Sequence, residues 1–193
     1  MSTQPDAATP DAGTVTLTVD GHVATITVDR ERKLNAFTPT MMAELEVAAR
    51  EADRSGARVV LVRTAGTKVF GVGADINLFA ELTPVEMWRD WTTDGHRAFA
   101  ALEAVRCPTI AVVDGLAFGG GLELALACDF RIMSDDARVA LPETGLGTVP
   151  GWGGTARTVE LIGASRTKEM VLARREVPAG QALEWGLASA VVP

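Results

Sequence analysis

The feature that most constrains this chain is the stretch from Thr109 to Asp129, where an apolar β-branched run precedes three consecutive glycines. Residues 109–113 predict a buried strand, and Gly119-Gly120-Gly121 precedes a segment whose apolar residues have helical spacing. Glycine is unfavourable inside regular elements, so three together indicate a backbone that another group approaches closely. A helix that begins here would point its first, unpaired N–H groups at that group. This is the layout of a binding site, although such a turn also occurs for packing alone.

Along the rest of the chain, the sequence patterns predict strands that alternate with helices. Alternating apolar runs on both sides of Asp20-Gly21 predict a β-hairpin. Thr38 followed by Pro39 predicts the start of a helix to about Asp53. Further strands are expected at 58–63, 130–133, 138–141 and 190–192, further helices at 74–80, 83–105, 155–162, 165–174 and 179–186, and glycine-rich loops at 64–73 and 145–154. The alternation predicts an α/β fold with a largely parallel sheet.

Length and charge limit the class of protein. A chain of 193 residues predicts one domain, with residues 1–13 as a disordered tail and 14–193 as the folded core. A net charge of −7 gives no support for nucleic-acid binding, and two histidines with two scattered cysteines argue against a zinc site. The opening residues lack the pattern of a signal peptide, and charged residues interrupt the apolar stretches, so we expect a cytoplasmic protein without a membrane span.

Three glycine-containing segments carry the candidate chemistry, namely 70–76, 119–123 and 141–154. The first two offer backbone N–H groups, and two such donors on one carbonyl oxygen would form an oxyanion hole. The last two each offer a glutamate, Glu123 and Glu143, and paired carboxyl groups can divide general acid and base roles. The simpler interpretation is that Glu123 interacts with a helix dipole, worth roughly 0.3–1 kcal/mol, and that Glu143 is an ordinary loop carboxylate.

These segments together resemble the crotonase superfamily, the enoyl-CoA hydratase/isomerase family. The matching pieces are Leu34-Asn35-Ala36-Phe37, Phe70 to Ile76, Ala111 to Asp129 and Leu141 to Gly154, and the resemblance extends from about Thr14 to Pro193. It implies a spiral of ββα units with an acyl-CoA bound across the loops. Family members usually continue with a helical C-terminal region that helps to cover the ligand and build the trimer, so this chain is expected to lack that region. A homotrimer or hexamer is the implied assembly.

The resemblance also implies roles for individual residues. The oxyanion-hole N–H groups match Val72 and Gly120, and the two hydratase glutamates match Glu123, which would orient and deprotonate water, and Glu143, which would deliver a proton to C2. Gly73, Ala74, Asp75, Ile76 and Gly151 match substrate-binding positions. Retention of both glutamates favours hydration of a 2-trans-enoyl-CoA to a 3-hydroxyacyl-CoA in fatty-acid or related metabolism, with no cofactor beyond the CoA of the substrate.

Two departures keep alternatives open. The loop before the Asn-Ala segment lacks the family's frequent proline, and its charged residues Arg30, Arg32 and Lys33 could either meet CoA phosphates or form a solvated charge run. The short C-terminus motivates a second interpretation, a truncated, non-catalytic acyl-CoA-binding module. A third is another crotonase reaction, such as isomerisation, dehalogenation, decarboxylation or thioester hydrolysis. Met87, Trp88, Trp91 and Trp152 are candidates for the acyl pocket, with core packing as the alternative.

Overall fold

The computed structural model describes residues 12–193, and most of the predicted tail lies outside the described residues. A larger sheet has the strand order β1-β2-β3-β5-β7-β10, and a smaller one has the order β4-β6-β8-β9. The pairs β1–β2 and β8–β9 are antiparallel and the other ladders are parallel. The strands span Thr14–Asp20 (β1), Val23–Asp29 (β2), Val59–Thr64 (β3), Val69–Gly71 (β4), Thr109–Val113 (β5), Leu116–Phe118 (β6), Phe130–Ser134 (β7), Arg138–Ala140 (β8), Val177–Pro178 (β9) and Ala190–Val192 (β10).

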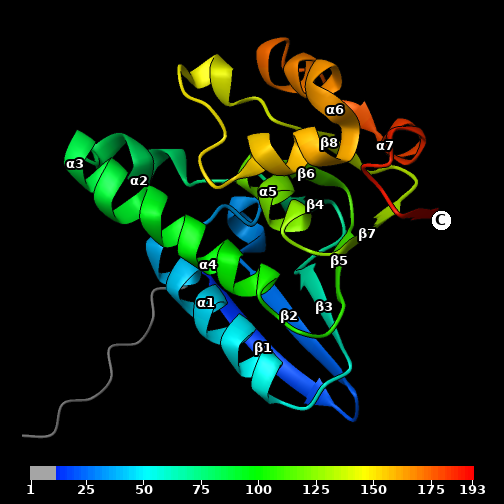
Figure 1. Cartoon of the computed structure of the whole chain (residues 1–193). Coiled ribbons are helices and arrows are strands. Elements are labelled where there is room, and N and C mark those ends of the chain that lie inside the picture. Colours follow the sequence, from blue (N-terminus) through cyan, green and yellow to red (C-terminus); the bar gives the residue numbers. More distant parts are fainter. Residues whose placement is uncertain (1–11) are drawn as a thin grey trace, which may run out of the picture.

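Helices pack on the two sheets (Figure 1). They span Glu31–Lys33 (η1, 3₁₀), Pro39–Arg54 (α1), Ile76–Glu81 (α2), Pro84–Glu86 (α3), Met87–Thr92 (η2, a π-helical turn), Thr93–Glu103 (α4), Gly120–Leu126 (α5), Glu143–Leu146 (η3, 3₁₀), Gly154–Leu172 (α6) and Ala179–Trp185 (α7). Helices α1 and α4 pack side by side, and α5 packs against β4, β5, β6 and α6. The alternating α/β architecture with largely parallel sheets confirms the fold class expected from the sequence.

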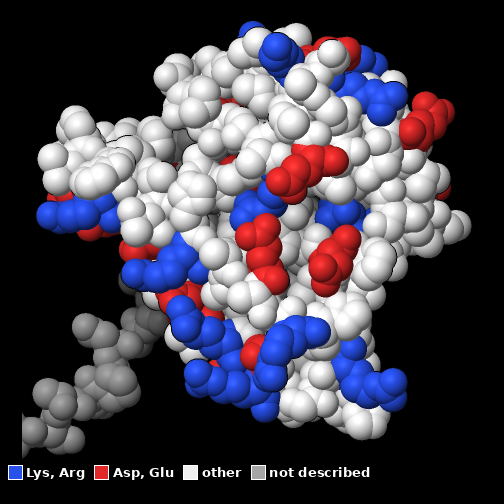
Figure 2. Space-filling model, in the orientation of Figure 1, with Lys and Arg blue, Asp and Glu red and all other residues white. Residues whose placement is uncertain are grey.

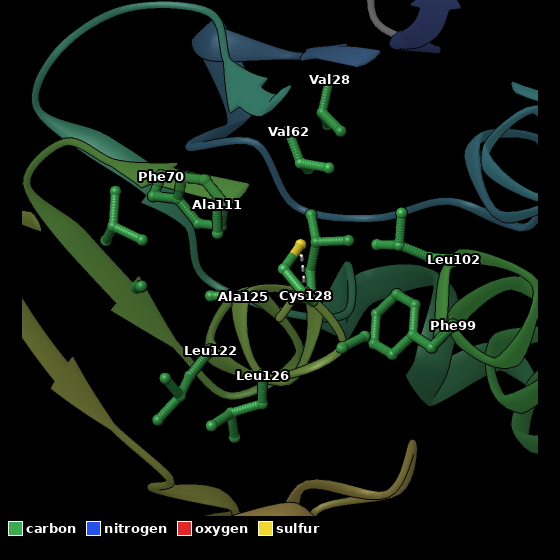
Figure 3. Packing of buried hydrophobic residues seen from close by; sticks show 14 of the residues in the cluster. Val28, Val62, Phe70, Phe99, Leu102, Ala111, Leu122, Ala125, Leu126 and Cys128 are labelled. Carbon is green, nitrogen blue, oxygen red and sulfur yellow. Dashed lines mark hydrogen bonds between the residues drawn. The ribbon is translucent and has the colours of Figure 1, made fainter. Parts of the chain in front are cut away.

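The core lies where α5 meets the strands and α4. Every residue of α5 is buried, including Leu122, Leu124 and Leu126. Figure 3 shows side chains of α5 together with Val62 of β3, Phe70 of β4 and Phe99 of α4. A helix that is buried all round must be apolar on every face, so the one charged residue in α5, Glu123, requires a separate explanation.

Local sequence signals set most element boundaries. The Thr38 hydroxyl accepts the Met41 N–H at 3.2 Å and so caps α1, with Pro39 in the first turn. Thr83 and Glu86 form the predicted capping box at α3. The helix predicted over 83–105 runs from Pro84 to Glu103 and contains the π-helical turn η2. The hydroxyls of Thr92, at the end of this turn, and of Thr93, the first residue of α4, donate to main-chain carbonyls five residues earlier.

Several short elements escape the sequence patterns. Strand β4 lies within the segment expected to be a loop, and neither β6 nor β9 was anticipated. The two helices expected at 155–162 and 165–174 are confirmed: they share the label α6 but are separated at Gly163, whose φ of +78° and ψ of 163° are not helical. Strands of two or three residues carry too little alternation for a period-2 pattern to be recognised.

The end of β4 and the start of α5 touch through glycine backbones. A Cβ atom placed on Gly121 would lie 2.2 Å from the Gly71 carbonyl oxygen, and one on Gly71 would lie 3.3 Å from the Gly121 Cα. No side chain fits at the first position without displacing main chain. This contact brings two of the glycine-rich segments identified in the sequence together.

Replacing Gly121 by alanine therefore tests the contact. We expect Gly121→Ala to lower the free energy of unfolding by about 1–3 kcal/mol, because the new methyl group overpacks against backbone. Urea denaturation followed by circular dichroism measures the change. Gly180→Ala is the matched control, since nothing lies within 4 Å of its Cβ position in α7, and alanine in a helix should be neutral or stabilising. Equal stability of Gly121→Ala and the control would contradict the close approach.

Candidate active site

Val72 and Gly120 lie beside one cavity, as the sequence predicted. Val72 directly follows β4, and Gly120 is the first residue of α5, so its N–H has no acceptor within the helix. Gly73 separates them with φ of +92°, and a Cβ on Gly73 would lie 2.8 Å from the Gly120 nitrogen. Only glycine permits both the conformation and the approach. The two segments thus form a concave backbone surface at a helix N-terminus, suited to bind a partly negative oxygen.

The cavity has a volume of about 190 Å³. It is lined by Val72, Gly73, Ala74, Ile76, Phe79, Met87, Trp91, Thr92, Gly119, Gly120, Glu123, Pro142, Glu143, Leu146, Thr148, Val149, Gly151 and Trp152. The lining brings together all three glycine-containing segments and adds the apolar side chains of α2 and η2. Figure 2 shows that the surface over α2 and over the segment after η3 is largely free of charged residues. The cavity therefore suits an apolar group that carries one polar centre.

Glu123 is held in a fixed orientation by main-chain donors. It lines the cavity, and the residue is 2% exposed. Its Oε1 accepts the N–H of Trp152 at 2.8 Å and the N–H of Gly154 at 2.7 Å. A Cβ on Gly154 would lie 2.7 Å from the Glu123 Cγ, so glycine is required there. Burial raises the pKa of Glu123, and the two N–H donors act in the opposite direction.

Unlike that of Glu123, the carboxyl group of Glu143 is not held by hydrogen bonds from the described residues. Neither of its carboxyl oxygens has a hydrogen-bond partner among the residues that the structure describes, although both atoms are buried. Burial, with a smaller contribution from the negative charge of Glu123, raises the pKa of Glu143 to about 7. A Cβ on Gly119 would lie 3.1 Å from the Glu143 Oε1, which places this carboxyl group at the start of α5. A carboxyl group of this kind holds a proton near neutral pH and can donate it.

Asp75 lies outside the lining of the cavity, and its expected part in substrate binding stays a prediction. Its carboxylate accepts the Arg30 guanidinium at 2.8 Å and caps α2 by accepting the Asn77 N–H at 3.0 Å. Arg30 is itself only 9% exposed and also donates to the Ala36 carbonyl at 3.1 Å. Burial acts to raise the pKa of Asp75, but the bonds from Arg30 and Asn77 outweigh it and leave this pKa below its usual value. Arg30 is thus a buried, paired charge and not part of a solvated charge run.

Asn35 completes the support behind the cavity. Its side chain accepts the Arg30 N–H at 2.9 Å and donates to the carbonyls of Ala65 and Val69 at 3.0 and 2.8 Å. The neighbouring Phe37 N–H donates to the Gly73 carbonyl at 2.7 Å, and the Asp75 N–H donates to the Phe37 carbonyl at 3.0 Å. The segment around Asn35 and Phe37 therefore fixes the position of the loop that carries Val72 and Gly73.

Three of the four side chains proposed for the acyl pocket line the cavity, and one does not. Met87, Trp91 and Trp152 line the cavity, whereas Trp88 is 72% exposed and does not. Phe79 also lines it and was missed. The signal for Phe79 is its position one helical turn after Ile76, which places both on the same face of α2.

Two further properties concern the described residues only. Within residues 12–193, no group of three or more His, Cys, Asp and Glu side chains is arranged to hold a metal ion. None of the helices in this range combines the length and apolar character needed to cross a bilayer.

With this geometry established, comparison with known proteins identifies the family. The model of the enoyl-CoA hydratase/isomerase family matches residues 18–193, and the chain belongs to that family. A short-chain-enoyl-CoA hydratase from Clostridium acetobutylicum is 37% identical over 179 residues, which is 92% of this chain and 68% of that protein. A probable enoyl-CoA hydratase, echA8, from Mycobacterium tuberculosis is 39% identical over 180 residues, covering 93% of this chain and 69% of that protein.

Solved structures agree with this assignment. The crystal structure of an enoyl-CoA hydratase from Bacillus anthracis superimposes with a TM-score of 0.87 at 36% identity, covering 93% of this chain and 70% of that one. The fold class and the family expected from the sequence are both confirmed.

The buried carboxyl group of Glu143 predicts a pH-dependent stability difference. Because its folded-state pKa of about 7 lies above the reference value of 4.5, the wild type loses stability as the pH rises between these values. Glu143→Gln removes the cost of ionising this group, so we expect it to stabilise the protein by roughly 1–3 kcal/mol at pH 8 and by much less at pH 5. Thermal melts at both pH values measure the difference. The exposed Glu160→Gln is the control, and an equal gain at both pH values would contradict the raised pKa.

The Arg30–Asp75 ion pair predicts a second stability effect. Arg30→Met leaves the Asp75 carboxylate buried without its guanidinium, so we expect a loss of about 3–5 kcal/mol. The double variant Arg30→Met/Asp75→Asn should recover part of that loss, because the uncompensated charge is gone and asparagine can still cap α2. Urea titration gives these values. The exposed Arg32→Met is the control, expected to stay within about 0.5 kcal/mol of wild type, and a similar result for Arg30→Met would contradict the pairing.

Proposed function

We propose that this protein is an enoyl-CoA hydratase that adds water to a 2-trans-enoyl-CoA to give a 3-hydroxyacyl-CoA, with Glu123 and Glu143 as the catalytic pair. The single observation that carries the proposal is the presence of both carboxyl groups on one cavity, one held by main-chain N–H groups and one buried without a partner. The family and its hydratase relatives support the same reaction.

The main-chain N–H groups of Val72 and Gly120 bind the thioester carbonyl oxygen. They polarise the conjugated double bond and make C3 electrophilic. As the oxygen of water bonds to C3, the electron pair of the double bond moves towards the carbonyl oxygen, and the two N–H groups stabilise the enolate that results. Preorganised donors of this kind typically contribute 10²–10³-fold to the rate.

The two glutamates divide the proton transfers. Glu123, oriented by the N–H groups of Trp152 and Gly154, accepts a proton from the attacking water. Glu143, whose pKa of about 7 leaves about half of the molecules protonated at neutral pH, delivers its proton to C2 of the enolate. One proton is gained by the pair and one is lost, so a transfer from Glu123 to Glu143 restores the starting state. Because the two carboxyl groups interact, measured pKa values belong to the pair.

Substrate binding requires no cofactor beyond the CoA carried by the substrate. Gly73, Ala74, Ile76 and Gly151 contact the thioester end from the cavity wall. The other crotonase reactions and a binding module without activity remain as outcomes of the test. A homotrimer or hexamer and a cytoplasmic location stay predictions, and size-exclusion chromatography with light scattering tests the assembly.

Activity of the purified chain tests the proposal directly. We expect wild-type protein to consume 2-butenoyl-CoA with loss of the enoyl-thioester absorbance, and mass spectrometry should show a product heavier by one water. Glu123→Gln and Glu143→Gln should each lower kcat by about 10²–10⁴-fold while the affinity for butanoyl-CoA stays nearly unchanged, because each removes only a proton transfer. Glu160→Gln, exposed on α6, is the control and should keep full activity.

Each alternative gives a different result in the same experiment. Tight binding of butanoyl-CoA without turnover of any thioester would favour a binding module. Turnover to an isomer, an acid or a decarboxylated product would favour another crotonase reaction. Either result with folded wild-type protein would contradict the hydratase assignment.

A further inference from the structure

We propose that the Trp152 indole, held in place by Trp91, forms the closed end of the acyl pocket and restricts the enzyme to short 2-enoyl chains. The inference rests on the proposed function and deepens it by naming the class of acyl group. Three observations support this inference: where the Trp152 indole lies, how its neighbours hold it in place, and which residues of the cavity lining are exposed.

The indole lies directly against the start of α5. A Cβ on Gly120 would lie 2.4 Å from Cζ3 of Trp152 and 3.1 Å from the Gly73 Cα. The six-membered ring therefore closes the space next to the proposed carbonyl-binding site. On its other side, a Cβ on Gly95 of α4 would lie 2.0 Å from the indole Nε1. Both glycines make room for the ring, so the ring fills a slot between α4 and α5.

Aromatic neighbours keep the ring from moving. Trp152 is 3% exposed, and its ring centroid lies 5.3 Å from that of Trp91, 5.5 Å from that of Phe99 and 6.0 Å from that of Phe37. Phe37 and Phe99 are fully buried behind it. The indole N–H donates to the Trp91 carbonyl at 3.4 Å. Trp91 lies in the π-helical turn η2, and single-turn π-helices are frequent at functional sites.

The exposed part of the cavity lining lies on α2, η3 and the loop after η3, whereas the Trp152 ring is buried. Ile76, Leu146 and Val149 line it and are 57%, 67% and 60% exposed, so they mark its mouth. The CoA moiety is too large and too charged to enter and must leave through this mouth. The acyl chain beyond C3 then extends inward, over the apolar wall of Phe79, Met87 and Trp91, until it meets Trp152.

The volume fits a short chain. At about 190 Å³ the cavity is smaller than the roughly 300–1,000 Å³ of pockets that enclose a drug-sized ligand. It therefore accommodates the reacting thioester end with a few further carbons. Each methylene that fails to fit an apolar pocket typically changes kcat/KM by about 10–200-fold, so chain length should be strongly discriminated.

A chain-length series tests the inference. We expect kcat/KM of the wild type to fall at least about tenfold from 2-butenoyl-CoA to 2-decenoyl-CoA. Trp152→Ala should reduce this ratio at least about tenfold by opening the end of the pocket, while its main-chain N–H still binds Glu123. Trp88→Ala is the matched control, because it removes a tryptophan that is 72% exposed outside the cavity and should leave the ratio unchanged.

Loss of a buried aromatic side chain can prevent folding, so Trp152→Leu and Trp152→Phe complete the series. They should give intermediate ratios, ordered by the size of the side chain, with circular dichroism confirming the fold. A wild type that is active on all chain lengths alike, or folded Trp152 variants with the wild-type ratio, would overturn the inference and leave the hydratase proposal intact. A folded wild type that hydrates no chain at all would instead overturn the hydratase proposal.

Discussion

The site depends on one contact, the approach of two glycine backbones where β4 ends and α5 begins. Gly71 and Gly121 touch without side chains between them, and Gly73 lies against the Gly120 nitrogen. Any larger residue would push the two segments apart. Because both proposed oxyanion donors are main-chain N–H groups on these segments, their spacing is set by packing of the backbone and depends on no flexible side chain. The buried helix α5 and the surrounding core then hold that spacing rigid.

The acid–base pair lies in an apolar environment at the start of α5, with Glu123 on that helix and Glu143 on η3. Glu123 is stabilised there by the N–H groups of Trp152, in the loop before α6, and of Gly154, the first residue of α6, whereas the Glu143 carboxyl group has no such partner among the described residues. A buried carboxyl group without partners is costly when ionised, and this cost raises its pKa into the range useful for proton donation. Burying Glu143 therefore lowers the stability of the folded protein, and it also makes a proton available near neutral pH. The ion pair of Arg30 with Asp75, one layer behind, stabilises the loop without touching the cavity.

Much of the architecture could be predicted from the sequence, because its signals are local. The Asp20-Gly21 turn, the Thr38 cap and the Thr83–Glu86 capping box each act over a few residues. The family resemblance then placed Val72, Gly120, Glu123 and Glu143 on what the structure shows to be one cavity. The ion pair of Asp75 with Arg30 was not anticipated, because Arg30 lies 45 positions earlier in the sequence and no local pattern reports that pairing. The slot for Trp152 likewise depends on Gly95 and Gly120, which lie on two different helices.

The most direct test of the central claim observes the carbonyl group itself. The Glu143→Gln variant should bind 2-butenoyl-CoA without rapid turnover, so the ¹³C resonance of a substrate labelled at C1 can be recorded in the complex. If the N–H groups of Val72 and Gly120 both bind the carbonyl oxygen, the resonance should move clearly downfield from its position in free substrate, because the carbonyl carbon loses electron density. A bound substrate whose carbonyl resonance stays at the free position would contradict the account.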